Sequence, residues 1–217
     1  MDVRVRRAIP FEEVDTATLR QALSGYARPD DKIGEMVRRG ELQRLRRGLY
    51  AIAPACRRGP LALEVLANSL YGPSYLSLEY ALSWHGLIPE RTSELTSVCR
   101  GRSRTFETAV GNFSYVSVAK AAYTEGYDLY NLPDERHFLM ATREKALVDT
   151  IAARRHASAT TLRDMAARLL DDLRVDAAGL LELDMKRVER FAALYGSHRT
   201  QLLAKFLRAL AAGSVRV

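Results

Sequence analysis

Residues 18–53 constrain the fold more than any other segment, because two short amphipathic stretches are followed directly by a basic, strand-like run. The first stretch carries apolar side chains at the spacing of one buried helix face: Leu19, Ala22, Leu23 and Tyr26. A break follows at Ala27-Arg28-Pro29, since a proline disfavours helical geometry in the residue before it. The pattern therefore predicts one helix before this break and a second helix after it.

The second predicted helix has signals at both ends. Asp30 or Asp31 can cap its N-terminus, and Gly40 stands where a glycine commonly closes a helix. A narrow apolar seam is formed by Ile33, Met36 and Val37. The opposite face is polar and mostly basic, with Lys32, Glu35, Arg38 and Arg39.

Residues 42–52, LQRLRRGLYAI, have the pattern of two strands that meet at an Arg-Gly turn. We expect Arg44 and Arg46 on one face of this hairpin and Arg47 near its tip. Helix, turn, helix and hairpin in this order are typical of a winged helix-turn-helix, whose second helix enters the DNA major groove. The predicted contacts with double-stranded operator DNA are Lys32, Arg38, Arg39, Arg44, Arg46 and Arg47. The alternative is an ordinary amphipathic helix pair beside an arginine-rich hairpin that only faces solvent.

Positive charge is concentrated in the same region. Residues 1–58 contain 13 Lys and Arg against 8 Asp and Glu, and residues 59–217 contain 20 against 18, so most of the net charge of +7 lies near the N-terminus. This asymmetry suits a part of the chain that neutralises phosphates. Arg4, Arg6 and Arg7 form a basic arm that is either a further DNA contact or a solvated tail.

Composition argues against a membrane protein and a secreted protein. The chain has no apolar run of about 18 residues and no signal-peptide core at its N-terminus, so no membrane partner is expected. Cys56 and Cys99 stand far apart and outside any metal-ligand spacing, which predicts a cytoplasmic protein without a disulfide or a metal site.

No pattern of catalytic residues or of a cofactor-binding loop is evident, and we expect neither catalysis nor a cofactor. The rival interpretation is a metal-dependent nuclease, for which the nearest candidates are Glu79, Glu144, Lys145 and Asp149. Glu144 and Asp149 are five residues apart on one predicted helix and point away from each other, which disfavours a shared metal.

The chain as a whole is predicted to be α+β. A winged helix-turn-helix in residues 1–58 is followed, after a short linker at 54–60, by a mixed α/β middle region and a C-terminal helical segment within residues 59–217. A hairpin is expected from strands at 94–100 and 112–118, and an irregular tyrosine-rich stretch at 122–133. Helices are predicted at 61–70, 77–85, 142–155, 160–173, 184–195 and 200–210.

Several side chains in this second part have predicted roles. His85 lies on an apolar helix face and should be a hydrogen-bonded core histidine. Lys145 and Asp149, at i and i+4, should form an exposed ion pair. Tyr123, Tyr127 and Tyr130 should pack a loop onto the domain, with stacking on single-stranded bases as the alternative. A second basic cluster, Arg100, Arg102 and Arg104, either extends the DNA footprint or contacts RNA.

Four segments carry a family resemblance: RRGLYAIA, PSYLSLEYALSWHGLIPE, TSVCRGRSRTF and ATREKALVDTIA. The matching residues are Ser77, Glu79, Ala81, Leu82, His85, Gly86, Leu87, Glu144, Lys145, Ala146, Leu147 and Asp149. In this order, and together with the winged-helix pattern, they resemble the AbiEi family of antitoxins from bacterial abortive-infection toxin–antitoxin systems.

This resemblance implies a DNA-binding antitoxin with a role in phage defence. Its winged helix would repress the operon that encodes it, and residues 59–217 would counteract a partner toxin of the nucleotidyltransferase type, without a stable complex between the two. The alternative is a plain winged-helix repressor without antitoxin activity.

Overall fold

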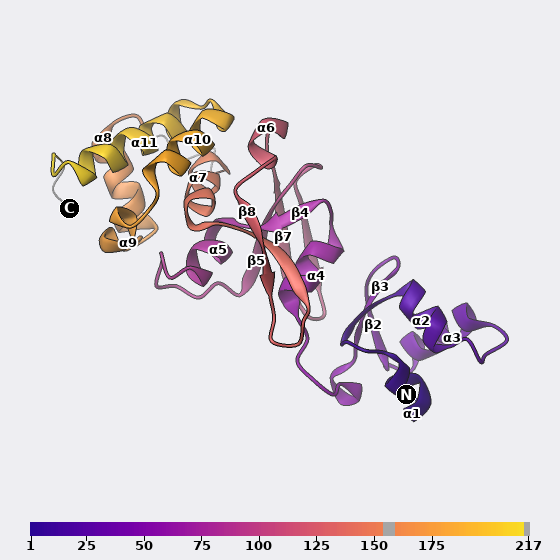
Figure 1. The fold of residues 1–217 in the computed structure, drawn as a ribbon. Coiled ribbons are helices and arrows are strands. Elements are labelled where there is room, and N and C mark those ends of the chain that lie inside the picture. The colour runs from indigo at the N-terminus through magenta and orange to yellow at the C-terminus, as the bar shows by residue number, and fades with distance from the viewer. Residues whose placement is uncertain (154–158, 215–217) are drawn as a thin grey trace.

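The N-terminal part of the chain is built on a small antiparallel sheet with strand order β1-β3-β2 and helices packed beside it (Figure 1). The structure is a computed structural model that describes residues 1–153 and 159–214. The N-terminal elements are α1 (Val3–Ala8), β1 (Glu13–Asp15), α2 (Thr16–Ala22), α3 (Pro29–Arg38), β2 (Leu42–Arg46) and β3 (Leu49–Ile52).

Local signals explain where α2 and α3 begin and end. The Asp15 carboxylate accepts a hydrogen bond from the Thr18 amide at 2.7 Å and so caps α2. The prediction that Asp30 or Asp31 caps α3 is wrong: Arg28 is the N-cap residue, Pro29 opens the helix, and both aspartates lie in its first turn, where they favour the helix dipole. Gly40 has a φ of +68°, as a glycine that closes a helix requires.

The first predicted helix is shorter than expected. It ends at Ala22, so Tyr26 lies outside it and is 37% exposed. Leu19 and Leu23 still point into a small apolar core that they share with Ile33, Met36 and residues of the sheet. This core holds α2, α3 and the β2–β3 hairpin together.

The predicted basic arm is helical rather than a free tail. Arg6, in α1, is only 6% exposed and forms an ion pair with Glu12. Its guanidinium also donates hydrogen bonds to the carbonyl oxygens of Ile9 and Cys56 at 3.0 Å each. Arg6 therefore fixes α1 onto the sheet and is not available to DNA.

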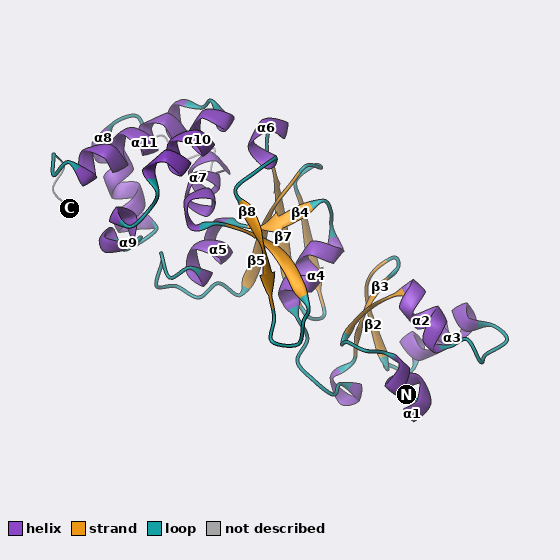
Figure 2. Ribbon diagram, in the orientation of Figure 1, coloured by secondary structure: helices purple, strands orange, loops and turns teal. Residues whose placement is uncertain are grey.

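The middle of the chain forms a second, mixed sheet with strand order β6-β7-β5-β4-β9-β8 (Figure 2). Its strands are β4 (Ser74–Leu76), β5 (Glu94–Cys99), β6 (Arg104–Thr108), β7 (Gly111–Ser117), β8 (Tyr127–Asn131) and β9 (His137–Ala141).

Two predictions about this sheet are wrong. The strands predicted at 94–100 and 112–118 are neighbours but run parallel, so they do not form a hairpin. The intervening segment supplies β6, which pairs antiparallel with β7 at the edge of the sheet. The stretch expected to be irregular contains a short helix, α6 (Lys120–Tyr123), and strand β8, which forms a hairpin with β9.

Most predicted helices are present. The sheet is accompanied by η1 (Pro54–Cys56), α4 (Leu63–Leu70), α5 (Leu78–Trp84) and α7 (Arg143–Ala153). Residues 154–155 of the predicted 142–155 helix lie outside the described residues. Beyond the sheet lie α8 (Leu162–Ala166), a π-helical turn (Ala167–Asp172), α9 (Ala177–Leu181), α10 (Met185–Tyr195) and α11 (His198–Ala211).

These C-terminal helices gather at the end of the molecule away from the N-terminal sheet (Figure 1). α8 and α10 begin at side-chain caps, Thr161 and Asp184, where the predicted helices begin. α11 begins at His198, capped by Ser197, and so starts before the predicted 200–210 helix. Their apolar faces belong to the same large core as the second sheet. Within the part of the chain that the structure describes, no helix is both long and apolar enough to cross a membrane.

The two parts of the chain are fastened together at the predicted linker. One oxygen of Glu12 accepts hydrogen bonds from the Arg58 and Gly59 amides at 3.1 Å each. On the neighbouring residue, the Glu13 carboxylate binds the Arg136 guanidinium at 2.7 and 2.8 Å. The adjacent carboxylates of Glu12, just before β1, and Glu13, in β1, therefore hold the linker and the β8–β9 turn.

We expect Arg136→Ala to release this linker. Loss of the Glu13 ion pair, and of the hydrogen bond that Arg136 donates to the Pro60 carbonyl oxygen at 3.4 Å, should raise the rate of tryptic cleavage after Arg57 or Arg58 by about tenfold, because cleavage requires local opening of the anchored segment. Limited proteolysis followed by mass spectrometry measures this rate. Arg91→Ala, which removes an exposed arginine elsewhere, is the matched control, and equal cleavage rates in both variants would show that Arg136 does not hold the junction.

Candidate nucleic-acid interface

A groove of about 550 Å³ separates α3 from the tip of the β2–β3 hairpin. Ile33, Gly34 and Val37 line it from α3, and Arg44, Arg47 and Tyr50 line it from the hairpin. Gly48, with a φ of +84°, makes the turn at the hairpin tip. The predicted reading helix and the predicted wing thus face a common space.

Three of the predicted DNA contacts, Arg38, Arg44 and Arg47, are exposed, and no ion pair is found for them among residues 1–153 and 159–214. Arg44 and Arg47 line the groove directly. A Cβ atom placed on Gly34, which also lines the groove, would lie 3.7 Å from the Arg38 guanidinium. The absence of a side chain at Gly34 therefore leaves space beside Arg38, and the three arginines bring uncompensated positive charge to this groove.

Lys32 and Arg39, also predicted as contacts, share an acidic partner. Glu35 binds Lys32 at 2.9 Å and Arg39 at 3.1 Å. These two hydrogen bonds hold the pKa of Glu35 below its ordinary value. Arg39 also lies 3.5 Å from Glu41, so the Lys32 and Arg39 side of α3 carries balanced charge.

Arg46 has a different environment from Arg44. The pairing of β2 with β3 shifts register between these two residues, which marks a bulge. The Arg46 guanidinium donates to the Ser69 carbonyl oxygen at 2.9 Å, at the end of α4, while Arg44 lines the groove. The prediction that the two arginines share one face is therefore wrong, and Arg46 contacts the second part of the chain.

Arg20 is not among the residues that the sequence pattern predicts for this site. Its guanidinium binds both carboxylate oxygens of Asp30 at 2.8 Å, linking α2 to the first turn of α3 at the edge of the groove. This contact holds the pKa of Asp30 below its ordinary value. No local spacing reveals a pair ten residues apart that depends on the angle between two helices.

The second basic cluster lies where β5 ends and β6 begins. Arg100, Arg102 and Arg104 are exposed, and the Arg104 guanidinium lies 5.4 Å from the ring centre of Tyr71. A Cβ atom on Gly101 would overlap the Tyr71 hydroxyl, so this loop packs closely on that ring. The cluster is a cationic surface that packs on the Tyr71 ring.

The tyrosines of the middle region pack as expected. The Tyr127 ring stacks on Tyr75 with ring centres 4.6 Å apart, and Tyr123 lies beside both. Tyr130 stacks on Phe138 at 5.8 Å. These rings fill space within the molecule, which confirms the packing role.

Lys145 and Asp149 are fully buried, so the prediction of an exposed ion pair is wrong. The two charges contact each other, and the other donors to Asp149 are hydroxyls: Tyr195 at 2.6 Å, Ser77 at 2.7 Å and Tyr75 at 3.0 Å. Burial and the Asp149 charge raise the pKa of Tyr75 and Tyr195. This network joins β4, α7 and α10, and because it includes the Ser77 side chain, Ser77 stands at the N-cap of α5 without a side-chain capping hydrogen bond.

The carboxylates considered for a nuclease lie in separate environments. Glu144 accepts a hydrogen bond from the Asp184 amide at 3.3 Å, whereas Asp149 lies in the buried network. Over residues 1–153 and 159–214, no group of at least three His, Cys, Asp or Glu side chains is arranged to hold a metal ion. His85 lies 2.8 Å from the Ala141 carbonyl oxygen, and burial lowers its pKa, which confirms the predicted hydrogen bond; the side chain is half-buried and not part of the core.

No protein-family model matches the chain, and no curated protein matches it. The structure is similar to the crystal structure of the RV2827C protein from Mycobacterium tuberculosis, with a TM-score of 0.49 and 20% sequence identity. The match covers 96% of this chain and 78% of that one. A likeness at this level carries no argument about function.

Proposed function

We propose that the chain is a transcriptional regulator that binds double-stranded DNA through residues 1–58, acting as a winged helix-turn-helix. The observation that carries this proposal is that Arg44 and Arg47 line the groove between α3 and the hairpin and that the Arg38 guanidinium lies beside Gly34 of the same groove, all three without an ion-pair partner in the described chain. Unpaired arginines on an exposed groove suit phosphate and base-edge contacts, since both are hydrogen-bond acceptors for guanidinium groups.

The dimensions of the elements support the same proposal. α3 has 10 residues, which corresponds to a length of about 15 Å. The B-DNA major groove is about 12 Å wide and admits one α-helix. With α3 in the major groove, the hairpin tip would meet the sugar-phosphate strand beside it, and Arg44 and Arg47 would face phosphates.

Salt dependence tests this proposal. Fluorescence anisotropy titrations with DNA from upstream of the chain's own gene should show binding that weakens with salt. The slope of log Kobs against log salt should be about −0.9 for each phosphate contact, hence about −3 if all three arginines contact phosphates. Absence of salt-dependent binding to any upstream fragment would refute the proposal.

We further propose that residues 59–217 counteract a toxin of the nucleotidyltransferase type, as in the AbiEi antitoxins. Support comes from the sequence resemblance, and from the positions of its motif residues. Ser77 comes from one matching segment and Lys145 and Asp149 come from another, and the three residues meet in one buried network. This part of the motif therefore holds the fold together, which fits a protein that acts by binding and regulation rather than by catalysis. A plain repressor without antitoxin activity is the alternative.

A strain that carries both a promoter reporter and the co-encoded toxin under an independent promoter separates these functions. Arg44→Glu combined with Arg47→Glu should abolish repression, because both reversals place negative charge at the groove, while rescue from the toxin should persist. Arg91→Glu is the control that should keep both activities. Failure of the unmodified chain to rescue would favour the plain repressor, and loss of rescue in the double variant at equal protein level would show that one surface serves both activities.

A further inference from the structure

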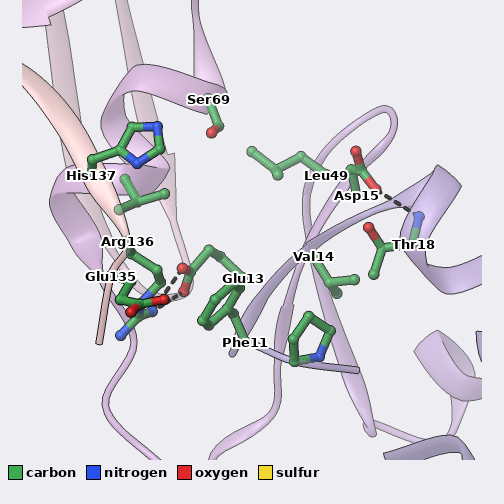
Figure 3. Close-up of a pocket in the computed structure, with 12 residues that line it drawn as sticks. Phe11, Glu13, Val14, Asp15, Thr18, Leu49, Ser69, Glu135, Arg136 and His137 are labelled. Carbon is green, nitrogen blue, oxygen red and sulfur yellow. Dashed lines mark hydrogen bonds and ion pairs between the residues drawn. The ribbon is translucent and has the colours of Figure 1, made fainter. Parts of the chain in front are cut away.

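A second cavity, of about 330 Å³, lies at the junction between the two parts of the chain (Figure 3). Its walls come from β1 and β3 on one side and from α4 and the β8–β9 turn on the other. The apolar part of the lining consists of Pro10, Phe11, Val14, Leu49 and Val65. Small-molecule sites are concave, mostly apolar and common at such junctions, with volumes of about 300–1,000 Å³.

The cavity is lined by more acidic than basic side chains. Arg136 contributes the guanidinium seen in Figure 3, but Glu13 binds it at 2.7 and 2.8 Å, and Asp134 binds it at 2.9 Å. Two further carboxylates, Asp15 and Glu135, line the same cavity and are exposed. No cationic side chain of residues 1–153 or 159–214 forms an ion pair with either of them. The uncompensated charge of the cavity is therefore negative.

Phe11 adds a surface suited to a cation. Phe11 is 39% exposed and lines the cavity, so its ring face is open to a ligand. The Arg136 guanidinium lies 5.2 Å from its centre, so the ring already faces one cation. Aromatic faces attract ammonium groups within about 6 Å of the ring centre.

We propose that this junction cavity binds a small organic amine, in which an apolar body of about ten non-hydrogen atoms carries one ammonium group. The apolar body would contact Val14, Leu49 and Val65. The ammonium group would lie against the Phe11 ring, attracted by the carboxylates of Asp15 and Glu135 on opposite walls of the cavity. This inference does not rest on DNA binding, because the ligand is recognised by side chains outside the candidate nucleic-acid interface.

A pair of probes that differ only in charge tests the site. 2-Phenylethylamine and 2-phenylethanol should be titrated against the full chain by saturation-transfer NMR. We expect the amine to bind about tenfold more tightly, because only the charged probe gains from the carboxylates and the ring face. Absence of saturable binding of the amine, or equal affinities for the two probes, would overturn the proposal.

A double variant locates the binding. Asp15→Asn with Glu135→Gln removes both charges while an asparagine at residue 15 still caps α2. This variant should bind the amine no more tightly than the alcohol, and it should keep the melting temperature of the parent. Asp128→Asn, an exposed carboxylate on β8 outside the cavity, is the matched control and should leave amine binding unchanged. Amine binding that survives the double variant would place the amine elsewhere and overturn the assignment.

Discussion

Replacing Lys145 with methionine should lower the free energy of unfolding by about 3–5 kcal/mol. Methionine keeps most of the aliphatic stem, so the main change is loss of the ammonium group. The Asp149 carboxylate would then remain fully buried, with hydroxyl donors from Ser77, Tyr75 and Tyr195 but without a cation. A buried charge without a partner destabilises the folded state because little solvent remains to stabilise it. Urea denaturation followed by circular dichroism measures the effect.

Two further variants show whether the cost comes from the buried charge. Lys145→Met combined with Asp149→Leu removes both charges and should recover a large part of the lost stability, since a buried ion pair can be replaced by apolar residues. Arg208 of α11 and Glu189 of α10 form an exposed ion pair with an N–O distance of 2.6 Å. Arg208→Ala breaks this pair and should leave the denaturation midpoint nearly unchanged. A midpoint for Lys145→Met as high as that of Arg208→Ala would mean that solvent reaches Asp149.

This pair also shows where prediction from the sequence stops. The i, i+4 spacing correctly predicted that Lys145 and Asp149 would meet, because that contact is local to one helix. Their burial depends on distant segments. A Cβ atom on Gly126, just before β8, would lie 2.8 Å from the Lys145 side chain and from Phe191 of α10. Only the assembled fold brings this glycine over the lysine, and no helical pattern reveals it.

Strand order was harder to predict than the helices for the same reason. The caps at Thr161 and Asp184 are local signals, and the helices begin where these residues indicate. The parallel pairing of β5 with β7 depends instead on contacts between segments distant along the chain. β6 is short, mostly exposed and at the sheet edge, so it lacks the alternating apolar pattern of a half-buried strand.

At the candidate interface, the sequence predicted the positions of the cations better than their surroundings. Glu35 lies three residues after Lys32 and four before Arg39, so its pairing with both was open to prediction from helix spacing. The bulge that separates Arg44 from Arg46 could not be predicted from spacing, because the alternation of side chains in a regular strand places both arginines on one face. The arginines and lysine that are close together in residues 32–47 therefore differ on the folded surface: some are paired with carboxylates and others are not.

We expect the three unpaired arginines, rather than the paired cations, to determine DNA affinity. Arg38→Ala, Arg44→Ala and Arg47→Ala should each weaken binding, by about 1–3 kcal/mol where the side chain reads a base and by less where it contacts phosphate. The triple variant should lose at least a hundredfold in affinity, and its salt slope should become shallower by about 1 for each lost phosphate contact. Anisotropy titrations at two salt concentrations measure both quantities.

The matched control removes an ion pair of the same helix. Lys32→Ala with Glu35→Ala deletes one positive and one negative charge that bind each other at 2.9 Å. Because the net charge of the helix is unchanged, this double variant should change DNA affinity by less than about threefold. If it weakens binding as much as the triple variant does, DNA must lie on the Lys32 and Arg39 side of α3. The Glu35 ion pairs would then have to open on binding, and the groove between α3 and the hairpin would not be the reading surface.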